Sequence, residues 1–270
     1  MSAIVDFGED PVIASRMVLI QDFRETHSQC QIVFTTQDRL DFIEGRTFIA
    51  WGQEWEAVSY KEVDRDTEYY YAVLGYPVGV CSVIDRKFTN LSSLANAVGV
   101  GLEGNSTDFA IPFPMHNICL SPLLYKLRYE SLERNLAHPE QSWFLFYDDR
   151  GLISKTYKGV SRGTVLEYDM DVLRSTGGHY YFVRDGLKVR YNQDHHPAKL
   201  SYKNYIGSLV GDKYDVKSIV PALIGERYKL TGSNQDKFLD HDKLVLVRQK
   251  YDSAKNPLPW SLTFGQLKIG

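Results

Sequence analysis

The sequence predicts a mainly β fold with an α/β unit of two helices in its middle. Strand-like runs of β-branched and aromatic residues lie before and after residues 87–160, and two helix-like segments lie within that range. The composition agrees, because 18 tyrosines and 13 phenylalanines are a high aromatic content for a chain of 270 residues. Aromatic rings pack well on pleated strands, and tyrosine can keep its hydroxyl group in water.

Residues 1–86 are predicted to form a small β-barrel or sandwich. Short runs with β propensity alternate there with turn residues such as Glu44-Gly45 and Asp64-Arg65-Asp66. Short strands at this spacing are typical of such folds. The expected strands are Met17–Asp22, Gln31–Thr36, Thr47–Trp51, Trp55–Val63 and Glu68–Leu74.

Residues 87–160 are predicted to begin with a short helix, Leu91–Val98. Asn90 can cap its N-terminus, and Gly99 can end it. The same stretch contains Gly99–Gly104, which fits the G-x-G-x-x-G pattern of dinucleotide-binding loops. That chemistry requires the loop to leave a strand and open a helix, whereas this loop follows a helix. The glycines therefore indicate a helix exit.

A second helix is predicted over Leu123–Ala137. Ser121 and Pro122 match an N-cap followed by proline at the first helical position, and His138-Pro139 is expected to end the helix. A broad apolar stripe is expected on one face: Leu124, Leu127, Leu132 and Leu136. A hairpin then follows, in which Trp143–Tyr147 and Leu152–Tyr157 flank the turn Asp148-Asp149-Arg150-Gly151.

Residues 161–270 are predicted to return to β structure. Tyr180–Val183 and Leu187–Tyr191 flank the turn Arg184-Asp185-Gly186, which indicates a second hairpin. Asn256–Pro259 contains two prolines and is expected to break the chain before the last strand. The remaining strands are expected at Tyr228–Leu230, Leu244–Lys250 and Trp260–Phe264.

Charge and cysteine usage exclude several functional classes. The 31 basic and 34 acidic residues give a net charge of −3, without the basic excess typical of proteins that bind nucleic acid or anionic membranes. No apolar run approaches the ~18 residues that span a bilayer, and the N-terminus lacks a signal-peptide pattern. Three cysteines, Cys30, Cys81 and Cys119, have no C-x-x-C spacing. We expect a soluble chain with free thiols.

The sequence offers no convincing catalytic or metal site. Asp194-His195-His196 and Asp240-His241-Asp242 contain ligand types, but contiguous loop residues diverge, so we expect solvated loops. The carboxylate pairs Asp64/Asp66 and Asp148/Asp149 lie in predicted turns, where aspartate serves backbone geometry. The glycosylation patterns at Asn90 and Asn105 lack any sign of secretion. We therefore assign no catalytic, cofactor-binding or metal-binding residue, and the partner-binding residues stay unknown.

Seven segments follow one another in a characteristic order: Tyr69–Gly75, Asp85–Thr89, Leu91–Gly104, Trp143–Leu152, Ile219–Thr231, Lys243–Tyr251 and Trp260–Phe264. Taken in this order, they are similar to phage late-control D proteins, to baseplate hub proteins and to the hub portion of the type VI secretion spike protein VgrG. Each match is a loose pattern of apolar, glycine and turn residues, so the resemblance depends on order and spacing. The second helix departs from the family pattern in its start and its end.

The resemblance implies two small tube-like β-barrel domains, residues 1–86 and 161–270, flanking the α/β insertion at 87–160. It further implies a homotrimeric ring whose six barrels match a sixfold tail tube on one side and a threefold spike on the other. The implied partners are the tail tube or a tube initiator, a spike on a separate chain, and baseplate wedge proteins. Neither a membrane nor specific nucleic-acid binding is expected, although DNA could pass through the lumen.

The sequence therefore favours a structural hub subunit of a contractile phage tail or related injection machine. Such a protein would be part of the virion tail or baseplate and would assemble in the host cytoplasm. Two alternatives stay open. One is a tube-initiating or tail-tip protein, whose barrels resemble those of the hub. The other is a β-rich hydrolase or carbohydrate-binding module, because exposed tyrosine and tryptophan rings stack on sugars.

Overall fold

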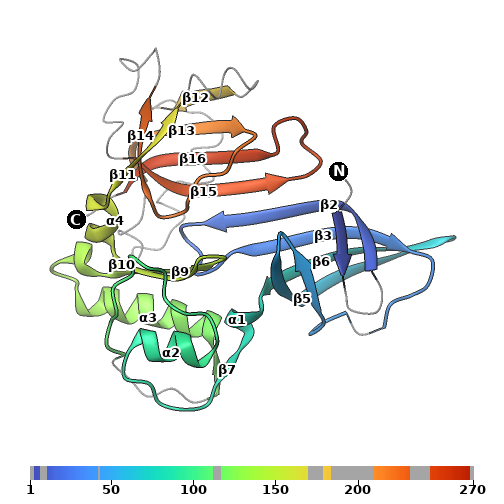
Figure 1. Cartoon of the computed structure of the whole chain (residues 1–270), viewed down its shortest axis with the longest axis horizontal. Coiled ribbons are helices and arrows are strands. Elements are labelled where there is room, and N and C mark those ends of the chain that lie inside the picture. The colour runs from blue at the N-terminus through green and yellow to red at the C-terminus, as the bar shows by residue number, and fades with distance from the viewer. Residues whose placement is uncertain are drawn as a thin grey trace.

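A computed structural model describes residues 3–6, 11–41, 43–111, 117–169, 179–183, 209–231 and 244–267. The fold is mainly β, with short helices gathered in the middle of the chain (Figure 1). No helix among the described residues has both the length and the apolarity needed to cross a bilayer. The helices are α1 (Val78–Cys81), α2 (Leu91–Ala97), α3 (Leu120–Arg134) and α4 (Tyr157–Arg162), with a 3-10 turn at Pro139–Gln141.

The first β region closes on itself. Its strands are β1 (Ala3–Asp6), β2 (Pro11–Asp22), β3 (Gln29–Thr36), β4 (Thr47–Ala50), β5 (Gln53–Arg65) and β6 (Glu68–Pro77). They pair in the order β1-β4-β5-β6-β3-β2, and β1 pairs again with β2, so the path is a barrel. The expected strands of residues 1–86 are confirmed, and β1 is an additional one.

The second β region continues the same sheet instead of forming a separate one. Its strands are β11 (Val165–Asp169), β12 (His179–Val183), β13 (Leu209–Ser218), β14 (Arg227–Thr231), β15 (Leu244–Asp252) and β16 (Trp260–Leu267). β15 pairs with β2, which joins the two regions into one sheet of 12 strands. Figure 1 shows β15 beside the blue strand β2, with β16 on the other side of β15. Among the described residues, no pairing between β11 and β12 closes the second region.

The helices and two small antiparallel pairs lie in the middle of the chain, between residues 78 and 162. β9 (Trp143–Asp148) pairs with β10 (Gly151–Thr156), and β7 (Val83–Ile84) pairs with β8 (Ile118–Cys119). The predicted hairpin is confirmed, and Gly151 has the positive φ of 105° that its turn requires.

The first predicted helix is confirmed in its capping. The Asn90 side chain accepts a hydrogen bond from the Ser93 backbone N–H, and Leu91 and Leu94 are buried. Gly99 and Gly101 both have positive φ, and the chain then leads to an isolated bridge between Leu102 and Leu152. The glycine pattern is thus a helix exit, as predicted.

The bounds predicted for the second helix were wrong at both ends. Helix α3 begins at Leu120 with Cys119 as its N-cap residue, so Ser121 is not the cap. It ends at Arg134, and Leu136 lies beyond it with 69% of its surface exposed. The buried stripe instead includes Leu120, because the apolar positions continue one turn before the predicted start.

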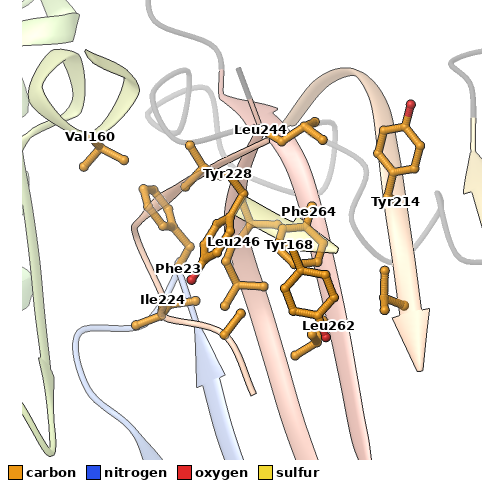
Figure 2. Packing of buried hydrophobic residues seen from close by; sticks show 14 of the residues in the cluster. Phe23, Val160, Tyr168, Tyr214, Ile224, Tyr228, Leu244, Leu246, Leu262 and Phe264 are labelled. Carbon is orange, nitrogen blue, oxygen red and sulfur yellow. The ribbon is translucent and has the colours of Figure 1, made fainter. Parts of the chain in front are cut away.

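The described residues form three hydrophobic clusters. One lies inside the first β region, around Trp55, Phe34 and Tyr71. The second lies between α2, α3 and one face of the β9–β10 hairpin. The third fills the second β region, where Figure 2 shows Tyr228, Phe264 and Leu246 packed together with Phe23. The domain bounds at residues 86 and 160 stay a prediction.

The β9–β10 hairpin is buried on both faces because side chains alternate along a strand. Leu145 and Leu152 point into the helical cluster. Phe144, Phe146 and Ile153 point into the cluster of the second β region. The hairpin therefore forms the wall between two cores.

Candidate assembly site

The loop from Phe23 to Ser28, between β2 and β3, is where the three regions of the molecule meet. We call this loop and its contacts the junction. Its backbone forms a parallel bridge with β9, in which Tyr147 N–H donates to the Thr26 carbonyl (2.8 Å) and Ser28 N–H donates to the Tyr147 carbonyl (2.9 Å). The first β region is thus tied to the insertion by main-chain hydrogen bonds.

Phe23 ties the same loop to the second β region. Its side chain is 2% exposed and stacks on Phe144, with ring centroids 4.2 Å apart and an angle of 8° between the planes. Its backbone N–H donates to the Val247 carbonyl on β15 at 2.8 Å. One residue of the first β region therefore lies in the core of the other.

Arg128 of α3 holds the loop from the outside. Its guanidinium donates to the carbonyl oxygens of Phe23 (3.2 Å), Arg24 (3.3 Å) and Glu25 (2.8 Å), and to the Tyr157 hydroxyl (2.9 Å). Carbonyl groups of a tight loop otherwise need water or neighbouring chain as partners. One arginine thus fixes the position of the loop relative to α3 and α4.

His27 is the buried polar centre of the junction, with 2% of its surface exposed. Its Nδ1 lies 3.0 Å from the Ser28 carbonyl, and its Nε2 lies 2.9 Å from the Ser121 hydroxyl of α3. Because a carbonyl only accepts, Nδ1 carries the proton and Nε2 accepts from the hydroxyl. The ring also packs against Tyr76 of β6, at 4.4 Å between centroids. Burial lowers the pKa of His27, so the neutral ring is the stable form.

This lowered pKa predicts a loss of stability in mild acid. The unfolded chain takes up a proton at His27 below about pH 6.5, whereas the folded chain resists it, so the free energy of unfolding should fall as the pH falls. Titration of His27 alone can change the free energy of unfolding by at most about 1.4 kcal/mol per pH unit. Urea midpoints measured across this range should depend less on pH in His27→Gln, whose amide can make both hydrogen bonds without titrating. Equal slopes for both proteins would contradict the prediction.

An ionic cluster joins the insertion to the second β region. Arg150 donates to both carboxylate oxygens of Asp148, with a shortest distance of 2.7 Å, and to the Ile224 carbonyl at 3.1 Å. Lys155 pairs with Glu226 at 2.8 Å. The Asp148 side chain is only 2% exposed, so its charge depends on Arg150. Asp148 also accepts from the Arg150 backbone N–H, in agreement with its predicted role in the turn.

Side chains also join the two β regions directly. Gln249 of β15 donates to Gln21 of β2, and both residues are buried. Arg16 of β2 forms a two-pronged ion pair with Asp252, at 3.0 and 2.7 Å. Hydrogen bonding from Arg16 lowers the pKa of Asp252. These contacts between β2 and β15 add to those of the junction.

The sites considered for chemistry do not converge. Asp194-His195-His196 and Asp240-His241-Asp242 lie outside the described residues. Within the described residues, no group of three or more His, Cys, Asp or Glu side chains could hold a metal ion. A cavity of about 370 Å³ lies beside α2, and Asp85 is the only carboxylate among its described lining residues. It therefore shows no carboxylate pair of the kind that glycosidases use.

The cysteines are free thiols in the structure, as expected. Cys30 is buried, and burial raises the pKa of its thiol. Burial also raises the pKa of Cys81 to about 12, so its thiol stays protonated. Neither has the low pKa of a nucleophilic cysteine.

The outer surface carries apolar side chains on a loop that the structure holds firmly. Ile219, Val220 and Leu223 are 44–48% exposed on the segment between β13 and β14. The same segment is fixed by hydrogen bonds from Ala222 N–H to Gln249 and from Leu223 N–H to the Tyr228 hydroxyl. Exposed apolar residues on a fixed loop are a feature of protein–protein contact surfaces.

Solved structures with a similar fold come from bacteriophage tails and a secretion machine. The match to a tail protein of Neisseria meningitidis covers 99% of this chain and 96% of that protein's chain, with 10% sequence identity and a TM-score of 0.53. The 43 kDa tail protein of prophage MuSo2 from Shewanella oneidensis covers 97% of both chains, with 8% identity and a TM-score of 0.56. This is the fold of phage tail proteins.

A third solved structure with a similar fold belongs to a secretion system. It is a component of the Escherichia coli type VI secretion system, described as structurally similar to the T4 bacteriophage tail proteins gp27 and gp5. The match covers 96% of this chain and 74% of the secretion protein's chain, with 12% sequence identity and a TM-score of 0.52. No protein-family model and no curated protein matches this chain by sequence.

The residues that hold this tail-protein fold together were missed by the sequence analysis. His27 and Arg128 carry no local motif, because their partners lie 94 and 103 to 105 positions away. Ser121 was noticed, but as a helix cap, whereas its hydroxyl binds His27. Only Asp148-Asp149-Arg150-Gly151 gave a usable signal, through its turn pattern.

Proposed function

We propose that this chain is a structural hub subunit of a phage tail baseplate or a related contractile injection machine. In this proposal three copies form a ring, which joins a sixfold tail tube to a threefold spike carried on a separate chain. Residues 1–86 and 161–270 supply the two barrels and residues 87–160 the insertion. The protein would be part of the virion tail and would have no catalytic activity.

One observation carries the proposal: a tail-protein fold in which the junction fixes two β regions in one orientation. A ring that must match six positions with three chains needs its two halves held at a constant angle. The stacked Phe23–Phe144 rings, the Arg128 contacts and the pairing of β15 with β2 supply that constraint. A permanent ring of this kind is expected to bury roughly 2,000 Å² or more per interface.

The test is assembly with the proteins encoded next to this one. The purified chain is mixed with the candidate tube protein and the candidate spike protein, separately and together, and the masses of the complexes are measured by native mass spectrometry. We expect three copies of this chain with one spike trimer. A complex with the tube alone would favour the tube initiator instead. Failure to bind either partner would contradict a hub role.

If DNA passes through the lumen of the proposed ring, we expect the protein to have negligible affinity for duplex DNA. The net charge of −3 supplies no excess of cations to displace the counterions of a duplex. We therefore expect no retardation of duplex DNA in a gel shift with micromolar protein at physiological salt. A shifted band that disappears as salt is raised would show a basic surface that the composition does not predict.

A further inference from the structure

Strand β5 leaves part of one edge open. Its first residues pair with β4, and the last contacts on that side are Ala57 N–H to the Arg46 carbonyl (2.9 Å) and Gly45 N–H to the Ala57 carbonyl (2.8 Å). Beyond this point β5 continues to Arg65 and pairs with β6 alone among the described residues. In the described part of the chain no strand pairs with this edge of residues 58–65, although the Arg39 side chain reaches Glu62 there.

The direction of the backbone groups on this edge follows from the hairpin turn. Arg65 and Glu68 are opposite each other across a two-residue turn, so their N–H and C=O groups bond to one another. Backbone groups alternate sides along a strand, and therefore those of Tyr60, Glu62 and Asp64 point away from β6. Among the described residues no backbone group pairs with them, and such a row of donors and acceptors is the template for adding another strand.

The segment is also accessible and balanced in charge. Tyr60, Lys61, Asp64 and Arg65 are exposed, and the hairpin reaches the right-hand end of the molecule in Figure 1. Lys61 and Arg65 offset Glu62 and Asp64, so the edge has no net charge. A strand with few charges can approach it without repulsion between like charges.

The second β region contains a strand with few charges, β12. β12 has the sequence His-Tyr-Tyr-Phe-Val, without acidic residues, lysine or arginine, and among the described strands it is the last one in the order of the sheet, beside β13. We propose that the open edge of β5 pairs with the β12 end of the sheet in a second copy of this chain. This inference rests on the proposed ring, and it names the contact between copies. The contact joins different surfaces, so it can close a ring.

The test blocks the backbone of the edge and leaves the rest of the hairpin intact. In Glu62→Pro/Asp64→Pro both N–H groups that point away from β6 are lost, and proline is tolerated on an edge strand at such positions. Glu62→Ala/Asp64→Ala is the matched control, because it removes the same side chains, including the exposed Arg39–Glu62 pair, and keeps both N–H groups. Circular dichroism and urea unfolding check that both variants fold.

The masses of the assemblies, with and without the spike, give the result. We expect the wild type and the alanine variant to form closed rings, and the proline variant to stay monomeric. The proline variant keeps its own β12 end, so mixing it with wild type should give open complexes in place of rings. Rings formed by the folded proline variant would overturn the edge contact and leave the hub proposal standing. Absence of assembly by the wild type with every partner would overturn both.

Discussion

Replacing Phe23 with alanine is expected to lower the free energy of unfolding by about 3–5 kcal/mol. The ring is buried in the core of the second β region although its backbone belongs to the first, and it stacks on Phe144. Its removal leaves a cavity at the point where both regions and the insertion touch. Urea unfolding followed by tryptophan fluorescence and by far-UV circular dichroism measures the loss.

The matched control for this variant is Leu136→Ala. Leu136 is also a large apolar residue, but it is 69% exposed, so its removal should change stability by no more than about 0.5 kcal/mol. Hydrogen exchange gives a second readout. Faster exchange at Tyr147 and Ser28 in Phe23→Ala would show that the junction opens first. A loss no larger than that of Leu136→Ala would mean that Phe23 does not hold the regions together.

Replacing Arg150 with methionine is expected to cost a similar amount, about 3–5 kcal/mol. The change leaves the buried Asp148 carboxylate without its two-pronged partner and the Ile224 carbonyl without its donor. The methionine side chain fills much of the space but supplies no N–H group. The midpoint of urea unfolding gives the loss directly.

Two further variants separate charge from packing at Arg150. In Asp148→Asn/Arg150→Met the unpaired charge is absent, so we expect the double variant to regain more than half of the lost stability. Arg39→Met breaks an exposed ion pair with Glu62 and should leave the midpoint unchanged. A double variant as unstable as Arg150→Met alone would show that the cost is not that of a buried charge.

Local structure was the part of the fold that the sequence predicted well. The strands of residues 11–77 follow from β-branched and aromatic runs between turn residues, and Asn90 and Gly151 mark a cap and a turn that the structure contains. These features depend on neighbours in the chain. Strand β13 was missed, because the charged residues Asp215 and Lys217 alternate with the buried residues Tyr214 and Val216 and interrupt the apolar run.

Contacts between distant segments could not be predicted in the same way. Helix α3 starts earlier than the Ser121-Pro122 pair suggests. Its residues Leu120 and Leu123 are buried in the cluster between α2, α3 and the β9–β10 hairpin. Tertiary packing outweighs a local capping preference of about 1 kcal/mol. The junction depends on His27, Arg128 and Phe23, whose partners only three-dimensional folding brings near. The family resemblance supplied the architecture, but it named none of these residues.

The pairing of β15 with β2 can form only late in the synthesis of the chain. Gln21 and Gln249 are 228 positions apart, so the edge of β2 that receives β15 stays uncovered while most of the chain is translated. All strands of the first barrel have been synthesised by Pro77, so the barrel can close long before β15 is synthesised. The nascent chain thus carries a bare strand edge for most of its elongation, and pairing between strands so distant in sequence forms slowly.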